Sequence, residues 1–405
     1  MRKYLFLLLL AQFGAQAMAG EAASEAELGK MLFFDPSFSV NRTMSCATCH
    51  DPGKGLADHR SNFGEGMVSL GDDGHSLGNR NAPTASYANT IPRFHYDAKQ
   101  KEYVGGQFLD GRAATLAEQA MQPPLNPLEM AMASPAEVVK RLRENPIYRK
   151  LFVRLYGEHV FDRPTNPSAV LPAYAAFGKA IQAFERTDAF SSYDSKYDRY
   201  LKGEYQLTVL EDLGRTLFFS NNNVNCASCH RLRREDGTHE PFSNFRYRNI
   251  GVPSNPKLLA LGNLKKGYID HGLLENPAVA DPKYDGKFRV PTLRNVAVTG
   301  PYMHNGVFTD LRTVLLFYDH YNNPKRRINP ETGKPWRAPE VPRTVDREEL
   351  MAHALSDRKI EALAAFLKLL TDKRYEPLLK QRTHECTGGV KCQRHDTARA
   401  GGASR

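Results

Sequence analysis

The chain has 405 residues, enough for two domains rather than one. Its 55 Lys and Arg residues outnumber 45 Asp and Glu residues, which leaves a formal net charge of +10. This moderate excess suits either a docking face for an acidic redox protein or simple solubility, and composition alone does not choose between them.

The amino terminus has the pattern of an export signal. Arg2 and Lys3 form a charged start, Leu5 to Ala11 are apolar, and Ala17-Met18-Ala19 is a small-x-small cleavage site. The apolar run is shorter than the ~20 residues that a spanning helix needs. We therefore expect a signal peptide at 1–19, a periplasmic mature chain, no membrane span after cleavage and no nucleic-acid partner.

Two Cys-x-x-Cys-His boxes, Cys46-Ala-Thr-Cys49-His50 and Cys226-Ala-Ser-Cys229-His230, are the most informative feature. In such a box the two thiols attach covalently to a haem, and the histidine becomes an axial ligand of its iron. A zinc ribbon needs its cysteine pairs about 12–20 residues apart, whereas these are 180 positions apart (226 − 46). A thioredoxin-type pair does not require the histidine. The sequence therefore predicts two covalently bound c-type haems.

Helical periodicity accompanies both boxes. The segments Leu28–Phe34 and Leu213–Phe219 share the pattern Leu-Gly-basic-x-Leu-Phe-Phe and predict a repeated helix ahead of each haem loop. Further helices are expected from Ser134 through Leu142, over Tyr174–Phe184, and over Ile360–Leu370 with Ser356 or Asp357 as cap.

The fold class that follows is mainly α. We expect two cytochrome c-like domains, each with one covalently bound haem, long loops and few strands. The expected divisions are the signal peptide 1–19, an amino-terminal domain 20–190, a carboxyl-terminal domain 191–380 and a flexible tail 381–405. The polar stretch Ser191–Asp198 marks the boundary, and 71–94 and 231–300 are expected to be loops around the haems.

Two cysteines remain in the tail, Cys386 and Cys392. Outside the cytoplasm a disulfide between them is favoured. Two unpaired thiols, or a metal site that also uses His384 and His395, are the alternatives.

The sixth ligand of each iron decides function, because a closed site transfers electrons and an open one binds peroxide. After the second box no methionine occurs between Met303 and Met351, so Tyr318, His320 and Tyr321 are the available donors. They belong to a helix expected from Leu311.

A haem that binds peroxide needs a nearby polar group that can move a proton between the two peroxide oxygens, and we look for this group near the first haem. Gln119 and Glu129 flank Pro123-Pro124-Leu125-Asn126-Pro127, a rigid turn that could hold them over a haem. Spacing alone equally allows a surface glutamate and a helix-face glutamine.

These residues resemble the bacterial dihaem cytochrome c peroxidases, and within them the MauG-type members, over the mature chain to about Leu379. The haem boxes by themselves are generic, and the presence of Tyr where peroxidases have Met points to the MauG type. The matching segments are 45–52, 105–108, 110–112, 125–127, 296–308 and 328–333.

The resemblance implies an unequal pair of haems. His50 would be the only protein ligand of a five-coordinate, high-spin, peroxide-binding haem, whereas His230 and Tyr318 would hold a six-coordinate one. Glu129 would be the acid–base group of the distal pocket, which Gln119 and Pro123 would also line.

It also implies a calcium ion between the haems, bound by the Asn81 side chain and the carbonyls of Thr299 and Pro301, since hard oxygen donors suit calcium.

The implied activity uses hydrogen peroxide, or oxygen plus electrons, to oxidise tryptophans of a docked protein, the precursor of methylamine dehydrogenase. This would mature its tryptophan tryptophylquinone. The alternatives are a peroxidase that reduces hydrogen peroxide to water with electrons from a small cytochrome c or copper protein, and a non-enzymatic dihaem electron carrier.

The sequence departs from the family at several positions. Leu109 stands where the family has a tryptophan between the haems, and Val224 where MauG-type members have one near the docking face. The only tryptophan is Trp336. His75 lies in the loop where classical peroxidases carry a removable haem ligand, although Gly74 and Ser76 beside it favour an exposed loop histidine.

Overall fold

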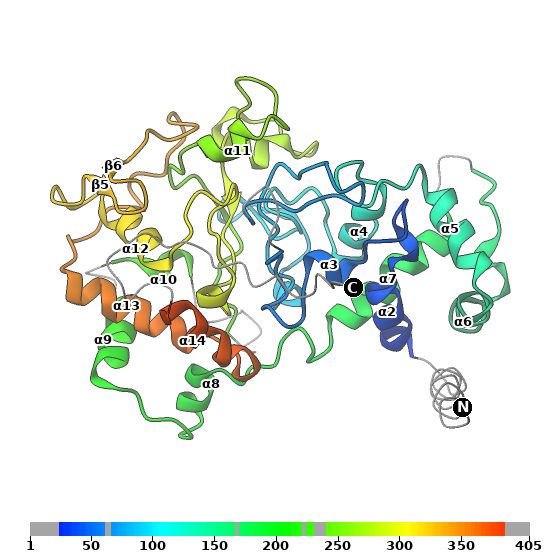
Figure 1. Ribbon diagram of the computed structural model, residues 1–405, viewed down its shortest axis with the longest axis horizontal. Helices are drawn as coiled ribbons and strands as arrows, with labels where there is room; N and C mark the ends of the chain where they lie inside the picture. Colours follow the sequence, from blue (N-terminus) through cyan, green and yellow to red (C-terminus); the bar gives the residue numbers. More distant parts are fainter. Residues whose placement is uncertain (1–23, 61–65, 167–169, 221–223, 231–239, 385–405) are drawn as a thin grey trace, which may run out of the picture.

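The computed structural model describes residues 24–60, 66–166, 170–220, 224–230 and 240–384. The signal peptide 1–19 and the two tail cysteines lie outside the described residues. Helices α2 and α4–α7 gather at one end of the molecule, and α8–α10 with α12–α14 at the other, while extended loops fill the space between (Figure 1).

Regular structure is mainly helical, which confirms the expected class. The α-helices are α2 (Glu25–Phe34), α3 (Cys46–Cys49), α4 (Leu116–Ala120), α5 (Pro135–Glu144), α6 (Pro146–Tyr156), α7 (Pro172–Glu185), α8 (Lys196–Leu201), α9 (Val209–Phe218), α10 (Cys226–Cys229), α11 (Pro256–Ala260), α12 (Leu311–Asp319), α13 (Asp357–Leu369) and α14 (Glu376–His384). The strands form short antiparallel pairs: β1 (His95–Asp97) with β2 (Glu102–Val104), β3 (Tyr247–Arg248) with β4 (Phe288–Arg289), and β5 (Ile328–Asn329) with β6 (Lys334–Pro335).

The repeated segment forms equivalent helix pairs in the two halves. In one half α2 packs on α7, and in the other α9 packs on α13. Gly29 lies so close to α7 that a methyl group there would overlap the Ala180 carbonyl, and Gly214 meets the Ala362 carbonyl of α13 in the same way. Glycine lets the helix backbones approach this closely, so the structure confirms the repeat.

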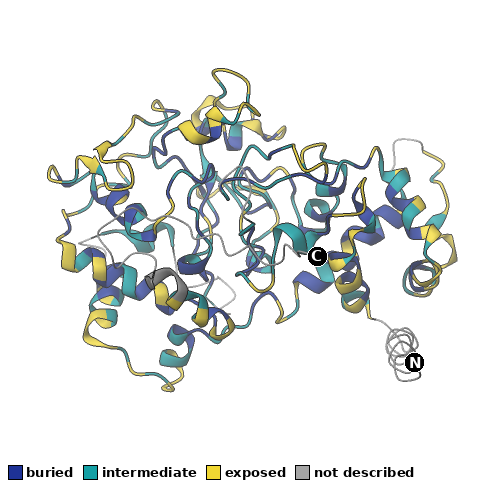
Figure 2. Cartoon of the chain, viewed as in Figure 1, coloured by how far each residue is buried: buried dark blue, intermediate teal, exposed yellow. Residues whose placement is uncertain are grey.

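Each helix pair belongs to its own apolar core. Buried residues between Leu28 and Phe190 form one cluster, and those between Tyr197 and Leu370 form another. Figure 2 shows buried residues on the inner faces of both helix groups.

A buried polar network joins the two halves. The Tyr87 hydroxyl donates to Asp372 Oδ1 (2.5 Å), and the Asn295 amide donates to Asp372 Oδ2 (2.9 Å). Arg294 forms a bidentate pair with Asp198 (2.9 and 3.0 Å). Because each of these buried polar groups has a partner, their desolvation is offset.

Several elements differ from the sequence expectation, among them α14, which was not expected and runs to His384, inside the stretch 381–405 expected to be a flexible tail. Helix α6 was not expected, α8 begins inside the polar stretch Ser191–Asp198, and α11 interrupts the expected loop 231–300. Ser195 caps α8, and Asp198 is buried because it pairs with Arg294, a contact distant in sequence. Among the residues that the structure describes, no helix is both long and apolar enough to cross a membrane.

Candidate haem sites

The first haem box presents an oriented, neutral imidazole. Cys46 and Cys49 begin and end the one-turn helix α3, and the His50 amide donates to the Cys46 carbonyl (2.9 Å). His50 Nδ1 lies 3.2 Å from the Leu56 carbonyl. With Nδ1 donating to that carbonyl, Nε2 is the nitrogen left for a metal. Burial lowers the pKa of His50, which favours the neutral form that binds iron.

The second box repeats this geometry. Helix α10 holds Cys226 and Cys229, and His230 Nδ1 lies 2.9 Å from the Phe242 carbonyl. Burial lowers the pKa of His230 to about 4. Both boxes therefore offer two thiols and an imidazole whose Nε2 is available, which fits a covalently attached haem.

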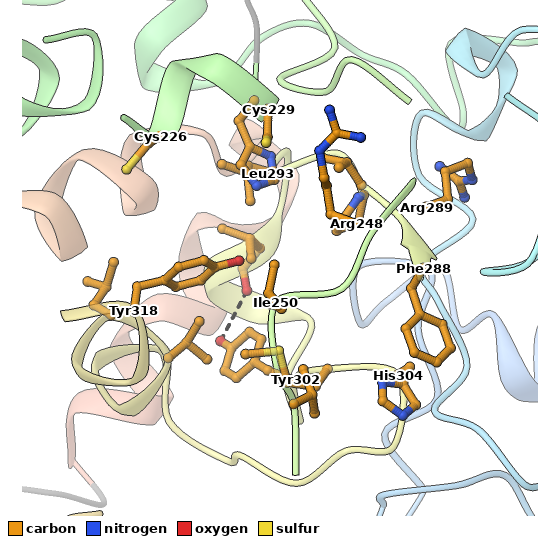
Figure 3. A pocket seen from close by; sticks show the side chains of 18 of the residues that line it. Cys226, Cys229, Arg248, Ile250, Phe288, Arg289, Leu293, Tyr302, His304 and Tyr318 are labelled. Carbon is orange, nitrogen blue, oxygen red and sulfur yellow. Dashed lines mark hydrogen bonds between the residues drawn. The ribbon is translucent and has the colours of Figure 1, made fainter. Parts of the chain in front are cut away.

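A cavity of about 350 Å³ adjoins the second box. Cys226, Cys229 and His230 line it, and Tyr318 lines it from α12 (Figure 3). Apolar side chains complete much of the wall, as a haem requires, including Leu109, Val224, Ile250, Leu293, Val296 and Leu315. The donor set and the apolar lining thus fit the cofactor.

Among the three candidate sixth ligands, Tyr318 is the one that lines the cavity. Its side chain is 36% exposed, on the side that faces this space. Burial raises the pKa of its hydroxyl, and so does the proximity of Cys229 and Cys226. Tyr321 instead donates to the Ile250 carbonyl (3.0 Å), and His320 bonds the Phe317 carbonyl and packs on Trp336.

Glu129 lies close to the first box. Burial is the main cause that raises the pKa values of Cys46 and Cys49, and the Glu129 carboxylate adds to it electrostatically. Burial in turn raises the pKa of Glu129 itself. The Asn126 amide donates to Glu129 Oε1 (2.7 Å), which orients the carboxyl.

Pro123 belongs to the same turn as Glu129, because the Met130 amide donates to the Pro123 carbonyl (3.4 Å). Gln119 lies at the end of α4, and its carbonyl accepts from the Gln122 amide (2.9 Å). The fold therefore brings Pro123 and Glu129 into one turn, and α4 leads directly into it.

The residues named for calcium also meet at one place. Asn81, Thr299 and Pro301 all line the cavity of the second box. The Asn81 amide nitrogen donates to the Met67 carbonyl (2.9 Å), so its oxygen is the atom left for a cation. Within the described ranges no group of three or more His, Cys, Asp or Glu side chains could hold a metal, and an amide with carbonyls is a different donor set.

The departures from the family pattern have definite positions. Leu109 and Val224 both line the cavity. Trp336 packs edge-on to Phe308 and donates to the Arg326 carbonyl (2.6 Å). His75 is exposed in a turn that Asp73 caps, as expected for a loop histidine.

The sequence did not indicate two charged residues near the haem sites. Glu185, the last residue of α7, is 5% exposed, and it raises the pKa of Cys46 electrostatically. Its position beside Phe184 gave no signal, because a glutamate at a helix end is ordinarily solvated. Arg289, at the end of β4, lines the second cavity.

Comparison with known proteins identifies the family. A family model described as di-haem cytochrome c peroxidase matches residues 23–206. The chain is 50% identical over 360 residues to the methylamine utilization protein MauG of Paracoccus denitrificans, which covers 88% of this chain and 90% of that protein. It is 32% identical to the cytochrome c551 peroxidase of Pseudomonas aeruginosa, over 73% of this chain and 72% of that one.

A solved structure agrees. The diheme peroxidase BthA of Burkholderia thailandensis superposes with a TM-score of 0.75 at 33% identity, covering 87% of each chain. The chain therefore belongs to the dihaem cytochrome c peroxidase family, and it is a haem-dependent oxidoreductase with two c-type haems.

Proposed function

We propose that this chain is a periplasmic MauG-type enzyme. It would use hydrogen peroxide to oxidise tryptophan residues in the precursor of methylamine dehydrogenase and so complete tryptophan tryptophylquinone. The observation that carries the proposal is the position of Tyr318, whose hydroxyl faces the same cavity as His230 and both thiols of the second box. The 50% identity to the Paracoccus methylamine utilization protein supports the same substrate.

We also propose the division into cytochrome c-like domains 20–190 and 191–380. One apolar core ends at Phe190 and the next begins at Tyr197, which supports this boundary. When bound, the two haems would supply irons that react with peroxide and hold its two oxidising equivalents.

The protein groups around the first haem would handle the proton. Burial raises the pKa of the Glu129 carboxyl, which makes its carboxylate form a stronger base. As the carboxylate it could take a proton from one peroxide oxygen, and as the resulting acid it could give that proton to the other. Asn126 engages Oε1, which leaves Oε2 for this transfer. Gln119 and Pro123 would shape the pocket, and His50 would be the single protein ligand of this iron.

The groups around the second haem would close its iron. The Phe242 carbonyl fixes the His230 ring, and His230 and Tyr318 would be the two protein ligands of this iron, Tyr318 after losing its hydroxyl proton. Tyrosinate is an anionic donor that stabilises oxidised iron. Asn81 with the carbonyls of Thr299 and Pro301 would hold calcium beside this haem.

Peroxide addition to the fully ferric holoprotein tests the proposal. We expect an immediate spectral change without prior reduction, and formation of the mature quinone when the precursor protein is present. Tyr318→Phe should abolish the oxidised state that both haems share. Tyr321→Phe is the matched control, because Tyr321 lies just after α12 but does not line the cavity, and its hydroxyl donates to the Ile250 carbonyl. A ferric protein that does not react with peroxide would contradict the proposal.

A second candidate is a peroxidase that reduces peroxide to water with electrons from a small cytochrome c or copper protein. Leu109 favours it, because an aliphatic side chain in the cavity wall cannot relay an oxidising equivalent as an indole can. This enzyme would react only after one haem had been reduced, and it would turn over without the precursor.

A further inference from the structure

Among the described residues of the second half three arginines are buried, and one of them lacks a carboxylate. Arg294 pairs with Asp198 (2.9 Å), and Arg248 pairs with Glu349 (2.5 Å). Arg289 is only 6% exposed, yet no ion pair joins it to any residue in the described part of the chain. Burial of a cation without an anionic partner is strongly unfavourable, so we expect an anionic group to bind this guanidinium.

Arg289 is nevertheless firmly positioned. Its Nε and Nη2 donate to the Phe108 carbonyl (3.3 and 3.2 Å), and its backbone amide donates to the Leu109 carbonyl (2.8 Å). Phe108 has a left-handed backbone (φ 61°), which bulky residues rarely adopt. The hydrogen bonds from Arg289 help to hold this conformation.

The acidic side chain that acts electrostatically on Arg289 is committed elsewhere. Asp110 acts on Arg289 electrostatically, but its Oδ2 accepts from Arg80 (2.5 Å) and Arg112 (2.8 Å). The Phe108 carbonyl is neutral and cannot balance a charge. Burial lowers the pKa of Arg289, but a guanidinium remains protonated in proteins.

The anionic partner of Arg289 is expected to lie inside the cavity. Arg289 lines the same space as Cys226, Cys229 and Tyr318. In Figure 3 the two cysteines lie at one end of this space, and Arg289 lies at the other. A haem carries two propionate carboxylates on its periphery, and they are the anions that this cavity would receive.

We propose that Arg289 binds a propionate carboxylate of the haem attached to Cys226 and Cys229. The same guanidinium holds the Phe108 carbonyl, so Arg289 ties the cofactor to the segment that carries Leu109, whose side chain lines the cavity. Arg289 is therefore a positioning residue. The inference rests on the haem content and not on which substrate is oxidised.

Reduction potentials of the holoprotein test this role. A nearby cation favours the reduced iron, so Arg289→Gln should lower the one-electron equilibrium constant for reduction of the second haem about tenfold, or about 59 mV. The first haem serves as an internal reference. Arg112→Gln is the matched control, because Arg112 lies over the Phe108 ring (3.6 Å) but is exposed and does not line the cavity.

A second variant keeps the test decisive if Arg289→Gln does not accumulate with both haems. Arg289→Lys keeps the charge but not the planar fork, so the potential should change less than threefold while the propionate bending band in the resonance Raman spectrum shifts. A tenfold change in Arg289→Lys, or an unmoved band in the variants, would overturn the proposal. So would a saturable effect of added phosphate on the wild-type potential, which would assign Arg289 to a soluble anion.

Discussion

Replacement of Glu185 by glutamine should stabilise the protein at alkaline pH. Glu185 is 5% exposed, and its Oε2 has no hydrogen-bond partner among the described residues. Burial raises the pKa of this carboxyl from 4.5 to about 8. The folded protein therefore binds this proton more tightly than the unfolded chain does.

The sign of the effect follows from proton linkage. Between pH 4.5 and about 8 the folded state holds the proton and the unfolded state does not, so stability falls as the pH rises. The interval spans about 3.5 pH units (8 − 4.5), and each is worth about 1.36 kcal/mol. The free energy of unfolding thus falls by at most about 5 kcal/mol above pH 8, and by about 3 kcal/mol at pH 7.

Urea unfolding of the holoprotein at pH 5 and pH 8, followed by circular dichroism, measures this pH-dependent change in the free energy of unfolding. Glu185→Gln is neutral at both pH values, so it should be more stable than the wild type by several kcal/mol at pH 8 and nearly equal to it at pH 5. Glu158→Gln, an exposed glutamate in the same half, is the control and should show neither effect. Equal differences at the two pH values would refute the argument.

Four further changes have distinct expected results. Tyr318→Phe should retain both covalent haems but lose the proposed tyrosinate ligand, which the ferric absorption spectrum of the second haem would report. Glu129→Gln should slow the reaction with peroxide by about 10²–10⁴-fold, measured by stopped flow, with haem content unchanged, because the proposed acid–base group is lost. Gly29→Ala should destabilise the first half by about 1–3 kcal/mol in thermal unfolding, because the added methyl group overlaps the Ala180 carbonyl. Gly214→Ala should do the same in the second half, and a tolerated alanine at either position would show that the helix pairs can separate without cost.

Local features explain why much of the fold was predictable. The helix ahead of each haem box, the helix capped by Ser134 and the helix capped by Ser356 all formed close to the expected bounds. Each depends on a capping residue and an apolar period within one segment, which are properties of neighbouring residues. Helix α8 was not predicted, because a stretch rich in Ser and Asp is typical of a domain boundary. Asp198 is buried because it pairs with Arg294, which lies 96 positions later in the chain.

The sixth-ligand question shows the limit of local pattern. Tyr318, His320 and Tyr321 lie within four positions, and the sequence left all three open. Only the packing of α12 decided that Tyr318 lines the cavity, while Tyr321 turns to the Ile250 carbonyl.

The two haem boxes were determined by sequence alone, because thiol attachment and histidine ligation need only residues that are adjacent in the chain. What surrounds each box was decided by the tertiary structure. Glu129 reaches the first box through a proline-rich turn, and Arg289 reaches the cavity of the second from a two-residue strand. The role of a buried charge depends on groups that are distant in sequence, because the folded chain alone determines how deeply the charge is buried and which partners it has.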